Sequence, residues 1–371
     1  MDFHHNEDRQ MLADTLSRYL QQRYPIDVRH AIARSDAGWS TEHWAALAEL
    51  GIPSALFRES AGGFGGTGFD IAIVFEQIGK ALVIEPFLGL LMAGRVLAQA
   101  GQGDRLAQAM SGDMVLAFAH EEPQSRYDLA QVEMRATPDG DGWTLTGHKA
   151  VVPHLEAASH IIVSARISGS AGDSDGIGLF SLARDAAGAE TRGYPLVDGG
   201  RGGELALNAS PATLLSERGH PLIEDAVAAG IVALSWEAVG VMDALKVATL
   251  DFLRTRTQFG VPIGKFQALQ HRMATVALEI EQARSAAINA AAALDGPRHA
   301  RERAVSAAKF TIGRVGTLVA EEAIQMHGGI GMTWELPLAH HAKRLTMIGH
   351  QLGDEDHHLE RFVALGRASA A

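Results

Sequence analysis

Apolar residues recur at helical spacing near both ends of the chain. In the first zone, 1–112, they return every three or four positions, for example at Leu12 and Leu16. This is the period of an amphipathic helix, with one face turned toward a core. The same period returns over 219–371, in longer segments. The pattern therefore predicts an N-terminal helical domain and a C-terminal helical bundle of four helices.

The zone between them, 113–218, has a different pattern. Short runs rich in apolar and β-branched residues alternate with Gly and Asp turns, which is typical of strands joined by tight connections. The expected strands are 114–119, 131–136, 143–146, 160–165, 177–182 and 204–207. We therefore expect a small antiparallel β domain in the middle of a mainly α chain, which makes the fold class α+β.

Composition and charge narrow the function. The chain has 371 residues, with 32 Lys and Arg against 44 Asp and Glu, so its formal net charge is −12. Nucleic acids and anionic membrane surfaces require a basic protein face, so neither is expected as the main partner. The chain has no cysteine, which excludes disulfides, thiolate metal sites and a cysteine nucleophile.

Neither a targeting segment nor a metal site is expected. The first ten residues contain acidic side chains and no apolar run, unlike a signal peptide. The longest apolar run, about 226–236, is too short to span a bilayer. We therefore predict a cytoplasmic protein without a membrane span. Paired histidines such as His340 and His341 point about 100° apart on a helix, so they do not converge easily on one ion.

Two strings in the last zone carry candidate chemistry. The first, RTRTQFGVPIGKFQALQH, covers 254–271. Within it, Arg256 offers a planar fork of N–H donors that suits a pyrophosphate. Gln258 adds an amide, and Phe259 adds an apolar ring face. This combination favours a ligand that has both phosphates and a ring.

The second string, QMHGGIGM, covers 325–332. Gly328 and Gly329 allow backbone N–H groups to approach an anionic or adenine-bearing ligand closely. Gln325 supplies a polar contact beside them. On the residues alone, an Arg256–carboxylate pair and a simple helix-ending turn remain the alternative interpretation of the two strings.

Together the strings resemble those of the acyl-CoA dehydrogenase family, whose helix–β–helix fold agrees with the order predicted above. The resemblance implies an FAD-dependent enzyme that converts an acyl-CoA to trans-2-enoyl-CoA, with electron-transfer flavoprotein as the electron acceptor. It also implies that one group of residues holds the ADP half of an FAD belonging to a neighbouring subunit. These residues are Arg256, Gln258, Phe259, Gln267, Gln325, Gly328 and Gly329.

Other stretches resemble one bacterial branch of that family, the pimeloyl-CoA dehydrogenase small subunits. They are 125–130, 193–199, 305–309 and 343–348. Members of this branch are thought to work in heteromeric pairs, so the resemblance implies a second dehydrogenase-like subunit in an α2β2 assembly. A homotetramer is the alternative. The acyl chain is left open among dicarboxylic, fatty and steroid side-chain thioesters.

Two segments that support the flavin ring in this family are altered here. The stretch 121–128 resembles the family's TEPxxGSD, but Arg126 and Tyr127 replace its glycine and serine. The stretch 151–154 resembles W-I-T/S-N, but Pro153 replaces the hydroxyl residue and has no N–H. We call 121–128 and 151–154 the ring segments. Their composition predicts a weakened support for the flavin ring beside an intact site for the ADP half.

The catalytic base is also altered. Removal of a proton from Cα of an acyl-CoA requires a positioned carboxylate. The family usually places a Glu six residues after an Ala-Lys pair, and Ala342-Lys343 leads here to Gly349. Glu237, inside an apolar helix that precedes the first string, is the substitute candidate. An ordinary polar pairing of Glu237 at a helix interface is the alternative.

Three hypotheses follow. In the first, the chain is one subunit of a heteromeric acyl-CoA dehydrogenase and contributes the ADP half of the FAD site to its partner. In the second, it is a self-sufficient homotetrameric enzyme that uses Glu237 as base. In the third, it has the fold but serves as an inactive scaffold subunit.

Overall fold

The computed structural model describes residues 7–368 and divides them into two compact units. The helical unit contains 7–29, 67–83 and 231–368, and the barrel unit contains 30–66 and 84–230. The division falls inside the helix α7 (Gly219–Thr255). The predicted segments 1–112, 113–218 and 219–371 are contiguous in sequence, whereas these units are not, and the three-segment division stays a prediction.

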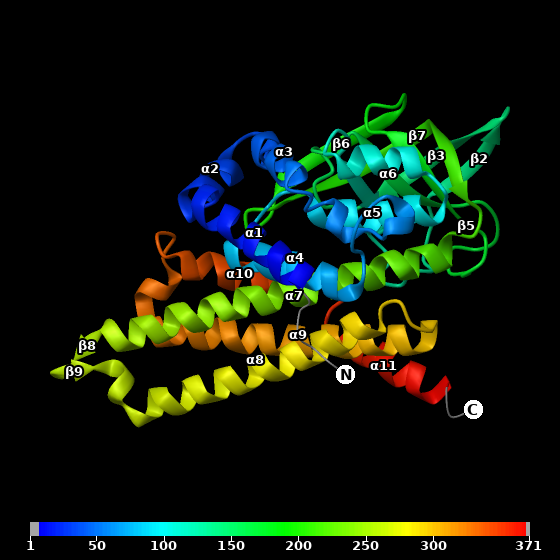
Figure 1. The fold of residues 1–371 in the computed structure, drawn as a ribbon. Coiled ribbons are helices and arrows are strands. Elements are labelled where there is room, and N and C mark those ends of the chain that lie inside the picture. The colour runs from blue at the N-terminus through cyan, green and yellow to red at the C-terminus, as the bar shows by residue number, and fades with distance from the viewer. Residues whose placement is uncertain (1–6, 369–371) are drawn as a thin grey trace. The chain divides into compact units, whose positions relative to one another are not determined.

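Long helices make up the helical unit (Figure 1). They are α1 (Glu7–Arg23), α4 (Gly68–Ala81), the larger part of α7, α8 (Gln267–Ala293), α9 (Arg298–His327), α10 (Pro337–His350) and α11 (Glu355–Ala368). Short elements join them: β8 (Thr257–Gln258), β9 (Val261–Pro262) and the 3-10 helices η3 (Ile263–Lys265) and η4 (Gly328–Met332). The predicted C-terminal helical bundle is confirmed.

Glycines allow α4 and α7 to cross at close range. A Cβ atom at Gly79 would overlap the carbonyl oxygen of Glu237, and one at Gly240 would overlap that of Glu76. The two backbones therefore touch where side chains would normally separate them. Because packed interiors leave no spare volume, this crossing requires glycine on both helices.

Gly240→Ala is therefore expected to lower the free energy of unfolding by about 1–3 kcal/mol, the usual cost of overpacking. Gly366→Ala is the matched control, since Gly366 also lies in a helix but a Cβ there meets no atom within 4 Å. Urea unfolding of the two variants measures the difference. Equal stability of the two would contradict the close crossing.

The barrel unit contains shorter helices and a seven-stranded sheet. Its helices are α3 (Thr41–Glu49), α5 (Phe87–Gln99) and α6 (Gly103–Met110), with η1 (Ser54–Leu56) and η2 (Glu59–Ala61), and α2 (Ile26–Arg34) leads into it. Its strands are β1 (Leu116–Ala119), β2 (Arg135–Asp139), β3 (Gly142–Lys149), β4 (His160–Arg166), β5 (Ile177–Ala183), β6 (Ala189–Pro195) and β7 (Arg201–Ser216). Strands β4, β2, β3, β7 and β5 close into a ring, with β1 paired to β4 and β6 paired to β7.

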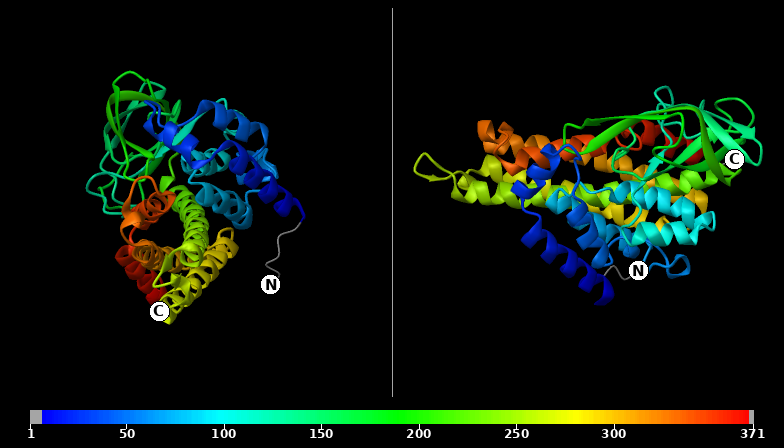
Figure 2. Two further views of the ribbon diagram at one scale, coloured as in Figure 1. Left: turned by 90° about the vertical axis from the view of Figure 1, so that its left-hand side faces the viewer. Right: turned by 90° about the horizontal axis from the view of Figure 1, so that it is seen from above.

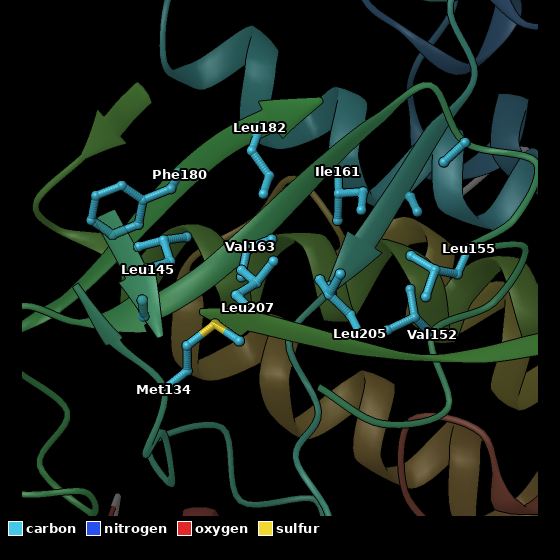
Figure 3. Packing of buried hydrophobic residues seen from close by; sticks show 14 of the residues in the cluster. Met134, Leu145, Val152, Leu155, Ile161, Val163, Phe180, Leu182, Leu205 and Leu207 are labelled. Carbon is cyan, nitrogen blue, oxygen red and sulfur yellow. The ribbon is translucent and has the colours of Figure 1, made fainter. Parts of the chain in front are cut away.

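The sheet is mostly antiparallel, as predicted, but β4 runs parallel to both β1 and β2. The alternation of side chains sets which face is buried and carries no information on strand direction, so the sequence could not show these pairings. Strand β6 was also missed, because Glu190, Thr191 and Arg192 give it an exposed edge without apolar alternation. Inside the ring, Leu145, Val163 and Leu207 belong to one buried apolar cluster (Figure 3).

Helix α7 is long and apolar enough to cross a membrane by length and composition. Its most apolar window is completely buried in the structure, which is also the behaviour of a core helix. The whole helix is longer than the run 226–236 because Glu237 and Asp243 interrupt the apolar residues without ending it. A single helix of this kind is weak evidence for a membrane span.

Candidate functional site

The first string forms a protruding hairpin in the helical unit. Strands β8 and β9 pair beyond the ends of α7 and α8 (Figure 2). Phe259 and Gly260 join them with positive φ angles of 54° and 81°. Two consecutive left-handed residues are the geometry of a type I′ hairpin turn. The turn leaves Phe259 91% exposed, and its ring meets Phe266 edge to face at 6.1 Å.

The second string lies where α9 ends. Gly328 follows the last residue of α9, His327, with a positive φ of 66°, and it caps the helix by donating its N–H to carbonyls of the preceding turn. A Cβ atom at Gly328 or Gly329 would meet nothing within 4 Å, so both backbones face open space. Gln325, one turn earlier, is exposed.

An aromatic stack brings the two strings together. The rings of Phe252 on α7 and His327 on α9 stack with centroids 4.3 Å apart. Arg256 lies one turn after Phe252 and donates its backbone N–H to the Phe252 carbonyl oxygen, while Gly328 follows His327 directly. Within the helical unit, the structure therefore places the beginning of the first string beside the end of the second.

Arg256 is available to a ligand. Its side chain is exposed, and its guanidinium has no partner among residues 7–368. An internal carboxylate pair, the alternative interpretation of this residue, is therefore not seen. Gln258 donates only to the neighbouring Thr257 carbonyl oxygen, and Gln267 is exposed at the start of α8. An exposed guanidinium without a partner among residues 7–368, exposed side-chain amides and open glycine backbone together fit the phosphates and adenine of a dinucleotide.

The ring segments lie in the barrel unit. The side chain of Glu122 is buried and accepts hydrogen bonds from the Lys149 ammonium at 2.7 Å and the Met134 N–H at 3.1 Å. The ammonium also donates to the Ser164 hydroxyl at 2.9 Å. Burial lowers the pKa of Lys149 to about 8, although the Glu122 carboxylate acts in the opposite direction. This buried pair fixes the end of β3 against the segment 121–128.

The backbone of the ring segments is strained. Arg126 and Tyr127 have positive φ angles of 45° and 70°, and Val151 and His154 have 51° and 53°. Arg126 stands at the position that resembles the family's glycine, so its backbone keeps a conformation that favours glycine. Such angles persist only where the surroundings fix them.

Most backbone donors in the second ring segment, and that of Ala150 just before it, are used within the protein. Three N–H groups donate to carbonyl oxygens: Ala150 to Glu121 at 2.9 Å, Val152 to Gly203 at 2.8 Å and His154 to Arg201 at 3.0 Å. Pro153 has no N–H. Because the carbonyl oxygens and unprotonated nitrogens of a flavin ring accept hydrogen bonds, a segment with few remaining donors is a poor fit to that ring.

Glu237 belongs to a closed polar network in the helical unit. Its carboxylate is 4% exposed and accepts two hydrogen bonds from the Arg344 guanidinium, at 2.5 and 2.8 Å. Arg344 also donates to the Gln351 side chain at 3.0 Å. The ordinary polar pairing is thus what the structure shows, and the catalytic role of Glu237 stays a prediction.

Gly349, at the position where the resemblance places a Glu, lies near the end of α10. A Cβ atom there would meet nothing within 4 Å. Its carbonyl oxygen accepts a hydrogen bond from the buried Lys309 ammonium at 3.0 Å, and that of Gly353 accepts another at 2.6 Å. Glycine has no carboxylate, so residue 349 itself cannot act as the base.

Sequence reasoning missed the partners in both units. Arg344 lies 107 residues from Glu237 in sequence, and no local spacing connects them. The pair of Glu122 and Lys149 is also distant in sequence. Here the sequence did offer a signal, because Glu122 lies in one ring segment and Lys149 lies just before the other, and an acidic and a basic residue in segments expected to lie together can form an ion pair. Among residues 7–368, no group of three or more His, Asp or Glu side chains could hold a metal ion.

Comparisons with known proteins cover nearly the whole chain. Family models of the acyl-CoA dehydrogenase N-terminal, middle and C-terminal domains match residues 6–110, 117–207 and 217–362. Acyl-CoA dehydrogenase IpdE2 of Mycobacterium tuberculosis is 30% identical over 91% of both chains. Its namesake in Mycolicibacterium smegmatis is 26% identical, covering 97% of this chain and 99% of the relative. A variant of the Tcur3481-Tcur3483 steroid ACAD superposes with a TM-score of 0.89 at 29% identity, covering 98% of this chain and 99% of that one.

Proposed function

Because the chain belongs to the acyl-CoA dehydrogenase family, we propose that it is one subunit of a heteromeric, FAD-dependent acyl-CoA dehydrogenase. In this assembly its hairpin and the end of α9 hold the ADP half of an FAD whose ring lies on a partner subunit. FAD, when bound, accepts the hydride from Cβ of the acyl thioester. This chain's own contribution is to bind and orient the nucleotide half.

One observation carries the proposal, namely the contrast between the two halves of the expected FAD site. The ADP half has an Arg256 without a partner among the described residues, exposed amides and open glycine backbone. The ring half has bulky residues at Arg126 and Tyr127, no N–H at Pro153, and neighbouring donors already bonded. A self-sufficient flavoprotein would need both halves.

The finer assignments are also proposals. We propose an α2β2 assembly in the cytoplasm, with electron-transfer flavoprotein as acceptor. The name of the steroid ACAD that is 29% identical to this chain joins two proteins, which supports a paired enzyme. The same name favours a steroid side-chain thioester as the substrate. A dicarboxylic or fatty acyl-CoA remains the alternative substrate.

Arg256→Ala tests the proposal in the complex with the partner subunit, for which a dehydrogenase-like chain encoded nearby is the first candidate. Loss of charge-assisted hydrogen bonds worth about 1.5–3 kcal/mol is expected to weaken FAD retention by about tenfold or more. Arg254→Ala is the control, because Arg254 is also exposed and lies two residues away. Flavin absorbance after gel filtration measures the retained FAD.

The same preparation tests the heteromeric part. The chain alone is expected to hold no FAD, and the pair is expected to hold it. A full equivalent of FAD per monomer on the isolated chain, with acyl-CoA oxidation, would contradict the proposal and favour the self-sufficient enzyme.

A further inference from the structure

The two strings are joined by the rings of Phe252 and His327. The ring planes are inclined by only 25°, and the centroids lie 4.3 Å apart. His327 is 8% exposed and Phe252 is half-buried, so water has little access to the stack. Aromatic pairs contribute to stability beyond the apolar area that they bury. A shift of either ring therefore disturbs the other.

The imidazole of His327 is oriented by its own helix. Its Nδ1 lies 2.8 Å from the Ala323 carbonyl oxygen. Because a carbonyl oxygen only accepts hydrogen bonds, Nδ1 carries the proton and donates it. Burial lowers the pKa of His327 against the effect of this hydrogen bond, so the ring is neutral at pH 7. The hydrogen bond fixes the orientation in which the ring meets Phe252.

On the side of the first string, the backbone connects Phe252 to the hairpin. The Phe252 carbonyl oxygen accepts the Arg256 N–H at 2.8 Å, and the Arg256 carbonyl oxygen accepts the Ile263 N–H at 2.8 Å. These two hydrogen bonds close the base of the hairpin. The backbone of Arg256 is therefore held relative to the Phe252 ring.

On the side of the second string, η4 packs against the end of α9. Gly331 is buried, and a Cβ atom there would lie 2.9 Å from the Ile324 carbonyl oxygen and 3.1 Å from the Cβ of His327. Glycine at this position lets η4 lie directly against His327. The backbone of 328–331 is therefore held relative to the His327 ring.

We propose that Phe252 and His327 are positioning residues that hold the two strings at a fixed separation, so that both strings bind the same nucleotide. Arg256 from the first string and the open backbone of Gly328 from the second then contact one ligand together. Groups that are already in place lose little conformational freedom on binding. The inference rests on the proposed function, since it concerns the same ADP half of FAD.

His327→Leu tests the proposal, because it removes the ring on α9 and leaves the first string unchanged. In the complex with the partner subunit, it is expected to raise the dissociation constant of FAD by about two- to tenfold, the range of one aromatic pair. His327→Phe is the matched control: it keeps a ring, loses the N–H for Ala323, and is expected to bind FAD like the parent. The flavin retained after serial dilution of each complex gives the dissociation constants.

Two further variants distinguish positioning from a general loss of stability. Gly240→Ala is expected to destabilise the crossing of α4 and α7, away from both strings, and to leave the dissociation constant of FAD unchanged. Arg256→Ala provides a double-mutant cycle with His327→Leu. Effects at independent sites multiply, whereas a stack that positions the strings couples them. Arg256→Ala is therefore expected to weaken FAD binding by a factor at least about twofold smaller in the His327→Leu chain than in the parent.

Three results would overturn the inference. The first is a His327→Leu complex that binds FAD as tightly as the parent, the second is an equal loss in His327→Phe or Gly240→Ala, and the third is multiplying effects of His327→Leu and Arg256→Ala. Failure of the proposed function gives a different result, since Arg256→Ala would then leave FAD retention unchanged even with His327 in place.

Discussion

Replacing Arg344 with methionine is expected to lower the free energy of unfolding of the chain by about 3–5 kcal/mol. The guanidinium is the partner of both oxygens of the Glu237 carboxylate, and the side chains are only 15% and 5% exposed. Removing the guanidinium leaves the buried, negatively charged Glu237 carboxylate without a positively charged partner. Urea unfolding, followed by circular dichroism, measures the loss.

The double variant Glu237→Leu with Arg344→Met is the decisive control. Removing both charges together is expected to restore most of the lost stability, since an apolar pair of similar volume often replaces a buried ion pair without penalty. If the double variant is as unstable as Arg344→Met alone, then lost packing of the long Arg344 side chain explains the effect, and the ion pair does not.

The same pair bears on the choice of catalytic base. A base must reach a substrate proton, and both Glu237 oxygens already accept hydrogen bonds from Arg344. We therefore expect Glu237→Gln to leave the activity of the heteromeric complex unchanged. Loss of activity in Glu237→Gln, with normal FAD retention, would instead favour the self-sufficient enzyme.

The local structure of the two candidate strings was predictable from the sequence because its determinants are local, whereas their role in nucleotide binding stays a prediction. The strings 254–271 and 325–332 are continuous, and their glycines mark a tight turn and a helix end where the structure has them. The order of the helical and β zones could also be predicted, from the spacing of apolar residues along the chain. What the sequence could not show is that Phe252 and His327 stack to bring the two strings together.

The features that the sequence did not predict depend on contacts between residues far apart in the chain. Arg344 and Glu237 meet only because α7 and α10 pack, and Tyr194 meets Glu204 only through the β6–β7 register. Strand β6 has little apolar alternation, so the strand was not predicted, although its last residues belong to the stretch 193–199 that resembles the family branch. Pro153 drew attention to the segment 151–154, but the sequence could not show that the N–H groups of Ala150, Val152 and His154 already bond to backbone oxygens.

Acid is expected to destabilise the helical unit through His358. This side chain is 1% exposed, and burial, with a further contribution from the charges of Lys309, His357 and Arg361, lowers its pKa to about 3. Its Nε2 lies 2.9 Å from the Leu352 carbonyl oxygen, in the loop after α10. Because the unfolded chain takes up this proton near pH 6.5 and the folded chain does not, stability is complete above pH 6.5 and falls as the pH drops toward 3.

The shift from 6.5 to about 3 corresponds to about 4–5 kcal/mol at 1.36 kcal/mol per pKa unit, lost over that whole interval. His358→Gln keeps a donor for the Leu352 carbonyl oxygen but does not titrate, so its free energy of unfolding is expected to fall less steeply between pH 6.5 and 4.5. Urea unfolding at several pH values measures the slopes, and hydrogen exchange in α11 locates the change. His299→Gln is the control, since His299 lies exposed on α9. Parallel slopes for His358→Gln and the parent chain would show that another group takes up the proton.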